Sequence, residues 1–326
     1  MYICAKIALA MRRNIQKVVA IINPVSGVGS KEKIPDLLQL RCREKGISLY
    51  VALTDSIGHA TELTKKAIEN NADCVIAVGG DGTVNEVARN LLYSDVVLGI
   101  IPRGSGNGLA RELCLPMDIK SSIDVLFSDR ISIIDACKAN EHIFFCTCGV
   151  GFDAVVSEQF AKEKHRGSLT YLKDIVASYL DFKPEKYELH IDNNIIREEA
   201  FLITCANASQ YGNNAYIAPA ADIRDGQMDI TILSAFNTLD IGPLAFQLFT
   251  KSIDKNSKIK TFRTKEARIV RHQAGMMHTD GDPVMTSKDI ELSVMRSAIH
   301  VFTPATISFA EGLQRRINEV VNFFYK

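Results

Sequence analysis

The sequence of 326 residues predicts two domains: an α/β domain with a parallel sheet covered by helices on both faces, followed by an antiparallel β-rich domain. Two observations predict this fold class. Up to about residue 130, apolar strands without polar alternation are separated by segments of helix length, as in buried parallel sheets. Beyond that point, polar turn signals lie between neighbouring strands, as in hairpins. We place the boundary near Ala136.

The first domain is predicted to alternate strands and helices along the chain. Lys17–Ile22 is a run of mostly β-branched residues that ends at Asn23-Pro24, and Gly46 stops the helix that follows it. The predicted strands are 17–22, 47–53, 73–78 and 96–101, and the predicted helices are 30–44, 60–70, 83–92 and 108–113.

The second domain is predicted from its turns. Asn140-Glu141 divides the segment 131–148 into two strands, and Asp192-Asn193-Asn194 separates two more. The predicted later elements are strands at 187–191, 195–205, 228–233, 259–270, 276–285 and 290–294, and helices at 167–179, 239–250 and 311–326.

The bulk composition favours an ordinary globular protein. Lys and Arg total 38 and Asp and Glu total 38, so the net charge is zero. The chain therefore lacks the net positive charge that would favour a nucleic-acid partner. The eight cysteines form no Cys-x-x-Cys pair, and we expect buried free thiols in a reducing compartment.

The first residues differ from a signal peptide, because Lys6 interrupts the apolar run and Arg12 and Arg13 follow it. We expect residues 1–15 to form a disordered leader, and either Met1 or Met11 could be the start. No run reaches the roughly 18 apolar residues that cross a bilayer. A cytoplasmic protein that contacts the membrane peripherally is therefore expected, and a homodimer remains open.

Three glycine-rich loops follow predicted strands of the first domain. They are Asn23-Pro-Val-Ser-Gly27, Gly79-Gly-Asp-Gly-Thr-Val-Asn-Glu86 and Pro102-Arg-Gly-Ser-Gly-Asn-Gly-Leu-Ala-Arg111. Open α/β sheets bind ligands where parallel strands end, and backbone N–H groups at such turns suit a polyphosphate. One loop alone predicts only a tight turn, whereas three in successive positions predict a phosphate site. The GxxxxGK[ST] sequence of P-loop enzymes is absent.

Asp81 lies inside the second of these loops. A carboxylate beside phosphates needs a cation or a hydrogen-bond network to offset repulsion, which favours a role with magnesium. A helix cap is the alternative, and the two roles are compatible.

The three loops together resemble the catalytic domain of the diacylglycerol kinase family, which includes bacterial lipid kinases and eukaryotic sphingosine and ceramide kinases. The resemblance covers about residues 16–304. It continues through Gly149-Val-Gly-Phe-Asp-Ala154, Pro219-Ala-Ala-Asp-Ile-Arg-Asp-Gly226 and Thr279-Asp-Gly-Asp-Pro283.

The resemblance implies a fold like that of NAD kinases and diacylglycerol kinases, with a β-sandwich as the second domain. It implies a nucleotide-binding domain at 16–136, a lipid-substrate domain at 137–300, and a segment at 301–326 that returns to the first domain. ATP would contact Asn23, Ser26, Gly27, Thr54, Gly79, Gly80, Asp81, Gly82, Thr83, Asn85, Glu86, Gly104, Ser105 and Asn107.

The resemblance also implies a structural magnesium ion held by Asp225 and by main-chain oxygens of Asp222 and Gln227. A turn in which Asp225 caps its own backbone is the alternative.

The family's Asp-Gly-Glu motif, which supplies the catalytic base, corresponds here to Asp280-Gly281-Asp282. We expect Asp280 to take the proton of the acceptor hydroxyl, with Asp282 or Asp81 as alternatives. Asp-Gly between strands is also a hairpin signal. Asp282 stands where the family has Glu, and this departure leaves open which aspartate is the base. A second departure from the family pattern is Tyr211-Gly-Asn-Asn214, in a loop that is expected to line the acceptor pocket.

The expected activity is transfer of the ATP γ-phosphate, with Mg2+, to a hydroxyl of a membrane lipid. An NAD kinase shares Gly-Gly-Asp-Gly-Thr, but the continuation Val84-Asn-Glu-Val87 and Gly104-Ser-Gly-Asn107 argue against it. A non-catalytic nucleotide- or lipid-binding regulator is the other alternative, and the presence of Asp81, Asp225 and Asp280 argues against it.

Overall fold

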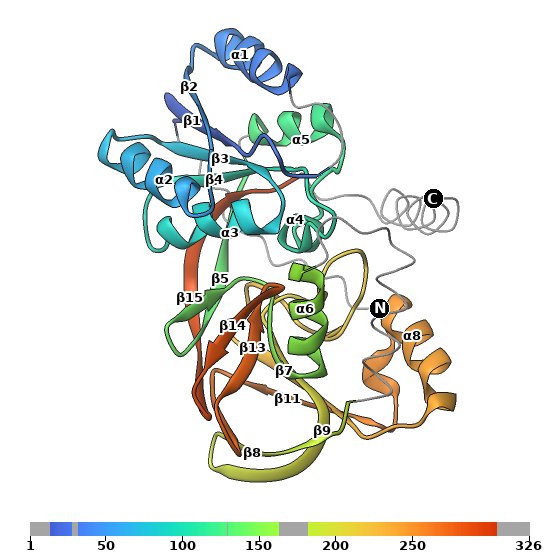
Figure 1. The fold of residues 1–326 in the computed structure, drawn as a ribbon. Coiled ribbons are helices and arrows are strands. Elements are labelled where there is room, and N and C mark those ends of the chain that lie inside the picture. Colours follow the sequence, from blue (N-terminus) through green and yellow to red (C-terminus); the bar gives the residue numbers. More distant parts are fainter. Residues whose placement is uncertain (1–13, 28–31, 129, 163–181, 305–326) are drawn as a thin grey trace.

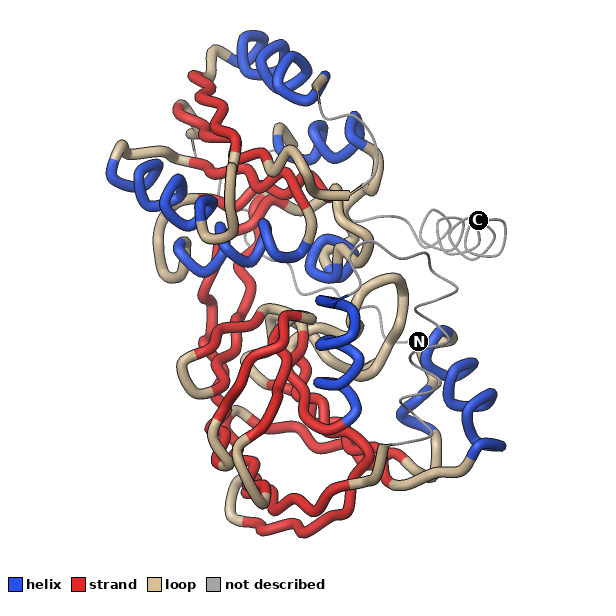
Figure 2. The backbone as a smooth tube through the Cα atoms, in the orientation of Figure 1, coloured by secondary structure: helices blue, strands red, loops and turns tan. Residues whose placement is uncertain are grey.

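A computed structural model describes residues 14–27, 32–128, 130–162 and 182–304 (Figure 1). An N-terminal half with a parallel sheet and helices stands above a C-terminal half built mainly of antiparallel strands, as the colouring by secondary structure makes plain (Figure 2). The predicted fold class is therefore confirmed. The predicted leader, apart from Asn14 and Ile15, and the predicted helices at 167–179 and 311–326 lie outside the described residues.

The N-terminal half contains four parallel strands in the order β2-β1-β3-β4. The strands are β1 (Lys17–Ile22), β2 (Ser48–Leu53), β3 (Cys74–Gly79) and β4 (Val97–Pro102). The helices are α1 (Lys33–Lys45), α2 (His59–Glu69), α3 (Asp81–Asn90), α4 (Gly108–Glu112) and α5 (Ile119–Leu126).

Helices cover both faces of this sheet. α1 contacts α5 and α2 contacts α3, and the two pairs lie on opposite sides of the strands (Figure 1). Every residue of β3 and β4 is buried, which explains their unbroken apolar sequences. α5 was not predicted; Asp118 caps it by accepting a hydrogen bond from the Ser121 N–H at 2.8 Å.

The C-terminal half is antiparallel. Its strands are β5 (Ile131–Ala139), β6 (His142–Phe144), β7 (Thr147–Gly151), β8 (Glu185–Ile191), β9 (Asn194–Ala206), β10 (Met228–Ser234), β11 (Ile259–Thr264), β12 (Glu266–Arg271), β13 (Gly275–Thr279), β14 (Asp282–Thr286) and β15 (Asp289–Phe302). Its helices are α6 (Phe152–Lys162), η1 (Thr238–Asp240), α8 (Ile241–Phe249) and η2 (Ile253–Lys255).

Four predictions for this half need correction. The single strand predicted at 276–285 is wrong, because β13 and β14 form an antiparallel hairpin that turns at Asp280-Gly281. The single strand predicted at 259–270 is wrong, because β11 pairs with β10 whereas β12 turns to pair with β8 and β15. α6 was missed. β15 extends eight residues beyond the predicted end at 294, because it leaves one half and enters the other.

β5 and β15 connect the two halves. Residues 131–134 of β5 pair with 299–302 of β15 beside the N-terminal core, whereas 137–139 pair with 292–294 beside the C-terminal core. A register shift separates the two stretches. There Asp135 accepts hydrogen bonds from the N–H groups of Ser297 (2.6 Å) and Gly226 (2.7 Å). The two cores therefore meet within a continuous strand pair.

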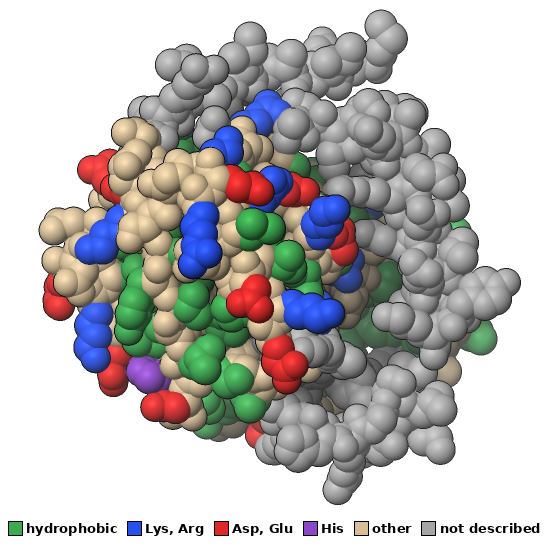
Figure 3. All heavy atoms as spheres, turned by 90° about the horizontal axis from the view of Figure 1, so that it is seen from above, with side chains coloured by type: hydrophobic (Ala, Val, Ile, Leu, Met, Phe, Trp, Pro, Cys, Tyr) green, Lys and Arg blue, Asp and Glu red, His purple; other side chains and the backbone are tan. Residues whose placement is uncertain are grey.

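The surface carries mixed charge. On the face seen from above, basic and acidic side chains alternate with apolar ones (Figure 3), in keeping with the zero net charge. Within the described residues, no helix is long and apolar enough to cross a membrane. Burial raises the pKa of the Cys205 thiol to about 12, which keeps it in the unreactive thiol form.

Candidate active site

The three glycine-rich loops meet at the carboxyl edge of the parallel sheet. The N–H of Asn23 donates to the Val78 carbonyl at 3.0 Å, and that of Arg103 to the Gly79 carbonyl at 2.7 Å. Thr54, at the end of β2, donates its N–H to Ile22 at 2.9 Å and is buried. The sequence therefore identified correctly which segments lie side by side.

Two glycines allow these loops to pack closely. A Cβ atom at Gly27 would lie 1.5 Å from the Arg103 carbonyl oxygen, and one at Gly104 would lie 2.5 Å from the Gly80 Cα. Gly27 also has φ = 62°, which favours glycine. The fold itself therefore requires these two residues to lack side chains.

Gly82 differs from them. A Cβ atom there would meet nothing within 4 Å, and the residue is exposed in the first turn of α3. No side chain caps the start of α3, whose N-cap is Gly80. Open space beside N–H groups at a helix start suits the close approach of a phosphate.

Asp81 connects the second loop to the third. Its carboxylate accepts hydrogen bonds from the N–H groups of Asn107 (2.8 Å) and Gly108 (2.7 Å), at the start of α4. Burial raises the pKa of Asp81 above its ordinary value, these N–H groups lower it, and the negative charge of Asp282 raises it. Asp81 therefore caps a helix, but not its own.

The side chains of several predicted ATP contacts form hydrogen bonds within the protein. Asn107 exchanges two hydrogen bonds of 2.8 Å with the backbone of Gly104. Asn23 donates its side-chain N–H to the Thr83 hydroxyl at 3.1 Å. Glu86 accepts from the N–H groups at 58 and 60 at 3.0 and 3.1 Å, and thus caps α2. These side chains shape the loops.

Two predicted serines differ in environment. Ser105 is exposed at the tip of the third loop. Ser26 donates its hydroxyl to the Asn23 carbonyl at 3.2 Å in the first loop. Of the two, Ser105 is the more open to a ligand.

Asp280 and Gly281 form the two-residue turn between β13 and β14. Both have positive φ, 51° and 86°, as a type I′ hairpin requires. The Asp280 carboxylate accepts four hydrogen bonds of 2.7 to 3.1 Å, from the N–H groups of residues 145, 146 and 147 and from the Asn85 side chain. Burial raises the pKa of Asp280, and the three backbone N–H groups lower it. The carboxylate thus fixes the turn and ties it to α3.

Asp282 lies two residues after Asp280, directly behind this turn. It is exposed at the first position of β14, and its charge acts on Asp81 of the opposite half. Asp280 as the proton acceptor stays a prediction, with Asp282 and Asp81 as the alternatives.

The loop 209–216 joins the C-terminal half to the third glycine loop. A Cβ atom at Gly108 would lie 3.0 Å from the Tyr211 carbonyl oxygen, and the N–H of Asn213 donates to the Gly106 carbonyl at 3.4 Å. Ser209 donates its hydroxyl to Glu112 of α4 at 2.8 Å. The departures from the family pattern at 211–214 therefore lie directly beside the third glycine loop.

A buried polar network supports both this loop and the Asp280 turn. Asp153, at the start of α6, accepts hydrogen bonds from the hydroxyls of Thr204 and Tyr211, the latter at 2.7 Å. His278 Nε2 lies 3.4 Å from Asp153, and its Nδ1 accepts from the Gly281 N–H at 3.3 Å.

Of the network's side chains, only Tyr211 was expected at the site, as part of the acceptor loop. Asp153, Thr204 and His278 were not expected there, although Asp153 is in the Gly149-Val-Gly-Phe-Asp motif. Gly149 leaves room for the network, since a Cβ there would lie 2.3 Å from Asp153 Oδ2.

The predicted magnesium loop is closed by the chain's own groups. Asp225 accepts a hydrogen bond from the Gln227 N–H at 2.9 Å, and Arg263 lies 3.7 Å away. The Asp222 carboxylate contacts Arg224 at 3.2 Å. Within the described residues, no group of three or more metal-ligating side chains occurs. These contacts match the alternative of a capped turn, and the magnesium ion at this loop stays a prediction.

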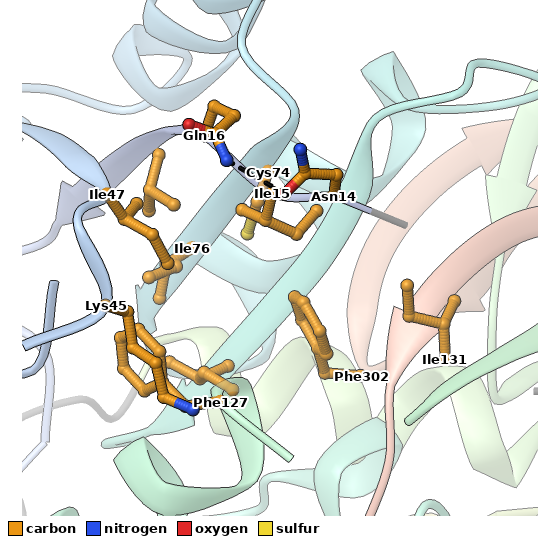
Figure 4. Close-up of a pocket in the computed structure, with 12 residues that line it drawn as sticks. Asn14, Ile15, Gln16, Lys45, Ile47, Cys74, Ile76, Phe127, Ile131 and Phe302 are labelled. Atoms are coloured by element: carbon orange, nitrogen blue, oxygen red, sulfur yellow. Dashed lines mark hydrogen bonds between the residues drawn. The ribbon is translucent and has the colours of Figure 1, made fainter. Parts of the chain in front are cut away.

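A cavity of about 220 Å³ lies at the other end of the sheet (Figure 4). Cys74 and Ile76 of β3 line it together with Phe127 and Phe302, and none of the predicted site residues does. Because open α/β sheets bind ligands at the carboxyl ends of their strands, this cavity does not define the nucleotide site.

Two family models match the chain. Residues 17–139 match the diacylglycerol kinase catalytic domain, and residues 146–303 match the YegS C-terminal NAD kinase beta sandwich-like domain.

Relatives match over most of their length. A probable lipid kinase YegS-like of Pectobacterium atrosepticum is 31% identical, covering 82% of this chain and 91% of the relative. A diacylglycerol kinase of Mycobacterium tuberculosis is 27% identical, covering 90% and 97%. The crystal structure of a putative diacylglycerol kinase from Bacillus anthracis has a TM-score of 0.74 at 21% identity, covering 90% of this chain and 98% of that one.

Proposed function

This chain belongs to the diacylglycerol kinase family of lipid kinases, and from that membership we propose that it transfers the γ-phosphate of ATP to a hydroxyl group of a membrane lipid. The observation that carries the proposal is the meeting of the two halves at α3. Its start has no side-chain cap and has open space at Gly82, and its Asn85 donates a hydrogen bond to Asp280 of the C-terminal half at 3.1 Å. A phosphate donor would lie on the glycine loops, and an acceptor would reach it from the C-terminal half.

The glycine loops would bind the polyphosphate. The start of α3 offers N–H groups that no side chain caps, and Gly82 leaves space for a phosphate oxygen to approach them. Magnesium bound with ATP would neutralise charge on the phosphates. The close packing of Gly27 and Gly104 keeps the three loops in one arrangement, so little ordering remains to be done when the nucleotide binds.

Asp282 is the better candidate for the proton acceptor. The oxygens of Asp280 already accept four hydrogen bonds, whereas Asp282 is exposed at the start of β14 and its charge raises the pKa of Asp81. In the proposed step the acceptor oxygen forms a bond to the γ-phosphorus and the bond to the bridging oxygen of ADP breaks. The hydroxyl proton passes to the Asp282 carboxylate. Asp280 would hold Asp282 in place.

The acceptor is proposed to enter along the loop 209–216, because this loop packs on the third glycine loop. A lipid substrate implies a protein that works at a membrane surface, and we propose a peripheral, cytoplasmic location.

An acceptor panel tests this proposal. Purified protein with γ-labelled ATP and magnesium is offered diacylglycerol, phosphatidylglycerol or a sphingoid base in mixed micelles, and NAD in parallel. Label in one lipid product supports the proposal. Label in NADP instead would make the chain an NAD kinase, and binding of ATP without transfer to any acceptor would indicate a non-catalytic regulator.

A further inference from the structure

The outer face of α8 has an unusual composition for an exposed helix. Ile241–Phe249 contains no charged residue, and its one polar side chain, Gln247, accepts a hydrogen bond from Asn256 at 2.6 Å. The side chains of Phe246 and Phe249 are 70% and 47% exposed, and Leu239 just before the helix is 87% exposed. A surface helix normally presents polar residues to water.

The inner face of the same helix is firmly packed. Leu244 is buried in a third apolar cluster, which also contains Phe152, Phe201 and Leu233. Asn237 and Asp240 cap η1 by a reciprocal pair of hydrogen bonds, which fixes the entry into α8. The exposed phenylalanines therefore project from a rigid support.

Lysines come shortly after α8 in the sequence. Lys251 and Lys255 are exposed directly after α8, and Lys258 is half-buried. Between residues 238 and 258 the acidic residues are Asp240, which belongs to the cap, and Asp254. An apolar face bordered by lysines complements a bilayer with anionic headgroups, in which aromatic rings enter the interface and ammonium groups meet phosphates.

α8 is also connected to the candidate site. The N–H of Tyr216 donates to the Leu248 carbonyl at 2.9 Å, and Lys251 lies over the Tyr216 ring, 5.1 Å from its centroid. Tyr216 ends the loop 209–216 that packs on the third glycine loop. A bilayer bound to α8 would therefore lie close to the side of the protein from which the acceptor is proposed to enter.

We propose that the outer face of α8, formed by Leu239, Phe246 and Phe249 with Lys251 and Lys255 at its edge, is the surface by which this protein docks on an anionic lipid bilayer. The proposal rests on the proposed lipid kinase function, although the docking itself is measurable without catalysis. In Figure 1 the helix lies at the outer margin of the C-terminal half.

Vesicle flotation without nucleotide tests the docking. Wild-type protein is mixed with vesicles of phosphatidylcholine containing phosphatidylglycerol, and the fraction that floats gives the partition coefficient. Phe246→Ser with Phe249→Ser should lower it by about tenfold or more, since two rings no longer enter the interface. The matched control is Leu40→Ser with Tyr50→Ser, at residues 55% and 64% exposed in the N-terminal half, and it should float like wild type.

Further variants distinguish docking on a bilayer from other roles of α8. Lys255→Gln should reduce flotation with anionic vesicles but not with pure phosphatidylcholine. Equal flotation of the phenylalanine variant and wild type would overturn the proposal. So would a wild-type dimer that becomes a monomer in the phenylalanine variant while flotation is unchanged, because α8 would then be an interface between copies.

Kinetics keep this inference distinct from the proposed function. With a short-chain diacylglycerol dissolved as monomers, the phenylalanine variant should keep the wild-type kcat/KM, and only turnover of vesicle-bound substrate should fall. Loss of both activities together would contradict a docking role. Flotation by α8 without any lipid turnover would support the docking surface and reject the kinase proposal.

Discussion

The three aspartates of the candidate site differ in what their carboxylates contact. Asp81 accepts hydrogen bonds from two N–H groups of the third loop, and Asp280 accepts from three N–H groups and Asn85. Asp282 is exposed at the first position of β14. Two of the aspartates are therefore held by backbone N–H groups of the site, whereas the carboxylate of Asp282 lies at the protein surface.

Gly82→Ala tests whether the open space at the start of α3 belongs to the nucleotide. A methyl group there meets nothing in the protein, so the free energy of unfolding should not fall, and alanine should slightly favour the helix. The KM for ATP should rise, on the order of tenfold or more, because the methyl group occupies the proposed phosphate position. Steady-state kinetics and urea denaturation measure the two effects.

Gly104→Ala is the matched control for this prediction. Its methyl group would lie 2.5 Å from the Gly80 Cα, so this variant should unfold at a lower urea concentration. An unchanged KM for ATP in Gly82→Ala would place the phosphates elsewhere.

His278→Gln tests the buried network behind the turn. His278 accepts the Gly281 N–H and contacts Asp153, so its loss should shift the turn that carries Asp282. We expect kcat to fall by on the order of 10²-fold with little change in the KM for ATP, because the ATP loops lie in the other half.

Tyr211→Phe removes a hydroxyl from the same network without touching the turn, and serves as the control. It should lower the free energy of unfolding by about 1 kcal/mol while kcat falls much less than in His278→Gln. Equal kcat losses in the two variants would contradict a positioning role for His278.

For the individual residues, the sequence predicted that the three glycine loops meet, but not the partners of the side chains around them. Glycine spacing predicted correctly that the three loops converge. It could not predict that Glu86 caps α2, or that Asp280 faces residues 145 to 147, because those partners are 26 to 135 positions away along the chain. His278 and Thr204 carry no local signal at all.

Among the elements, α3 is the one on which most of the site depends. It carries the open turn at Gly82, caps α2 through Glu86, and holds the Asp280 turn through Asn85. Its periodicity predicted the helix itself. α6 was missed because it begins directly after β7, with no turn residues between the two elements. The bend between β11 and β12 was missed because the apolar pattern continues through it.

α4 supplies a pH-dependent contact between the halves. Burial raises the pKa of Glu112 above its ordinary value near 4.5, although Ser209 lowers it in part. Above pH 4.5 the folded protein therefore retains a proton that the unfolded chain has lost. Glu112 should accordingly contribute stability at low pH that is lost as the pH rises from 4.5 through the raised pKa.

Urea denaturation over a pH series tests the direction of this change in the free energy of unfolding. Glu112→Gln, which has no proton to lose, should show a smaller fall in the free energy of unfolding across that window than wild type. Glu69→Gln, at an exposed position of α2, should follow wild type. A Glu112→Gln profile parallel to wild type would contradict the assignment.

The whole molecule consists of two cores that share one continuous strand pair. β5 and β15 pass from one core to the other, with Asp135 at the register shift between them. The change from parallel to antiparallel patterning predicted two domains correctly. It could not predict that β15 would reach β4, since that pairing joins residues about 200 positions apart.

The central claim is that a lipid hydroxyl receives the γ-phosphate of ATP, with Asp282 as the proton acceptor. Transfer of label from γ-labelled ATP into the organic phase, compared between wild type and Asp282→Asn, tests it most directly. We predict that wild type labels the lipid, and that Asp282→Asn loses about 10² to 10⁴ in rate while ATP affinity is nearly unchanged. Label that stays in the aqueous phase as NADP, or an Asp282→Asn variant as fast as wild type, would contradict the claim.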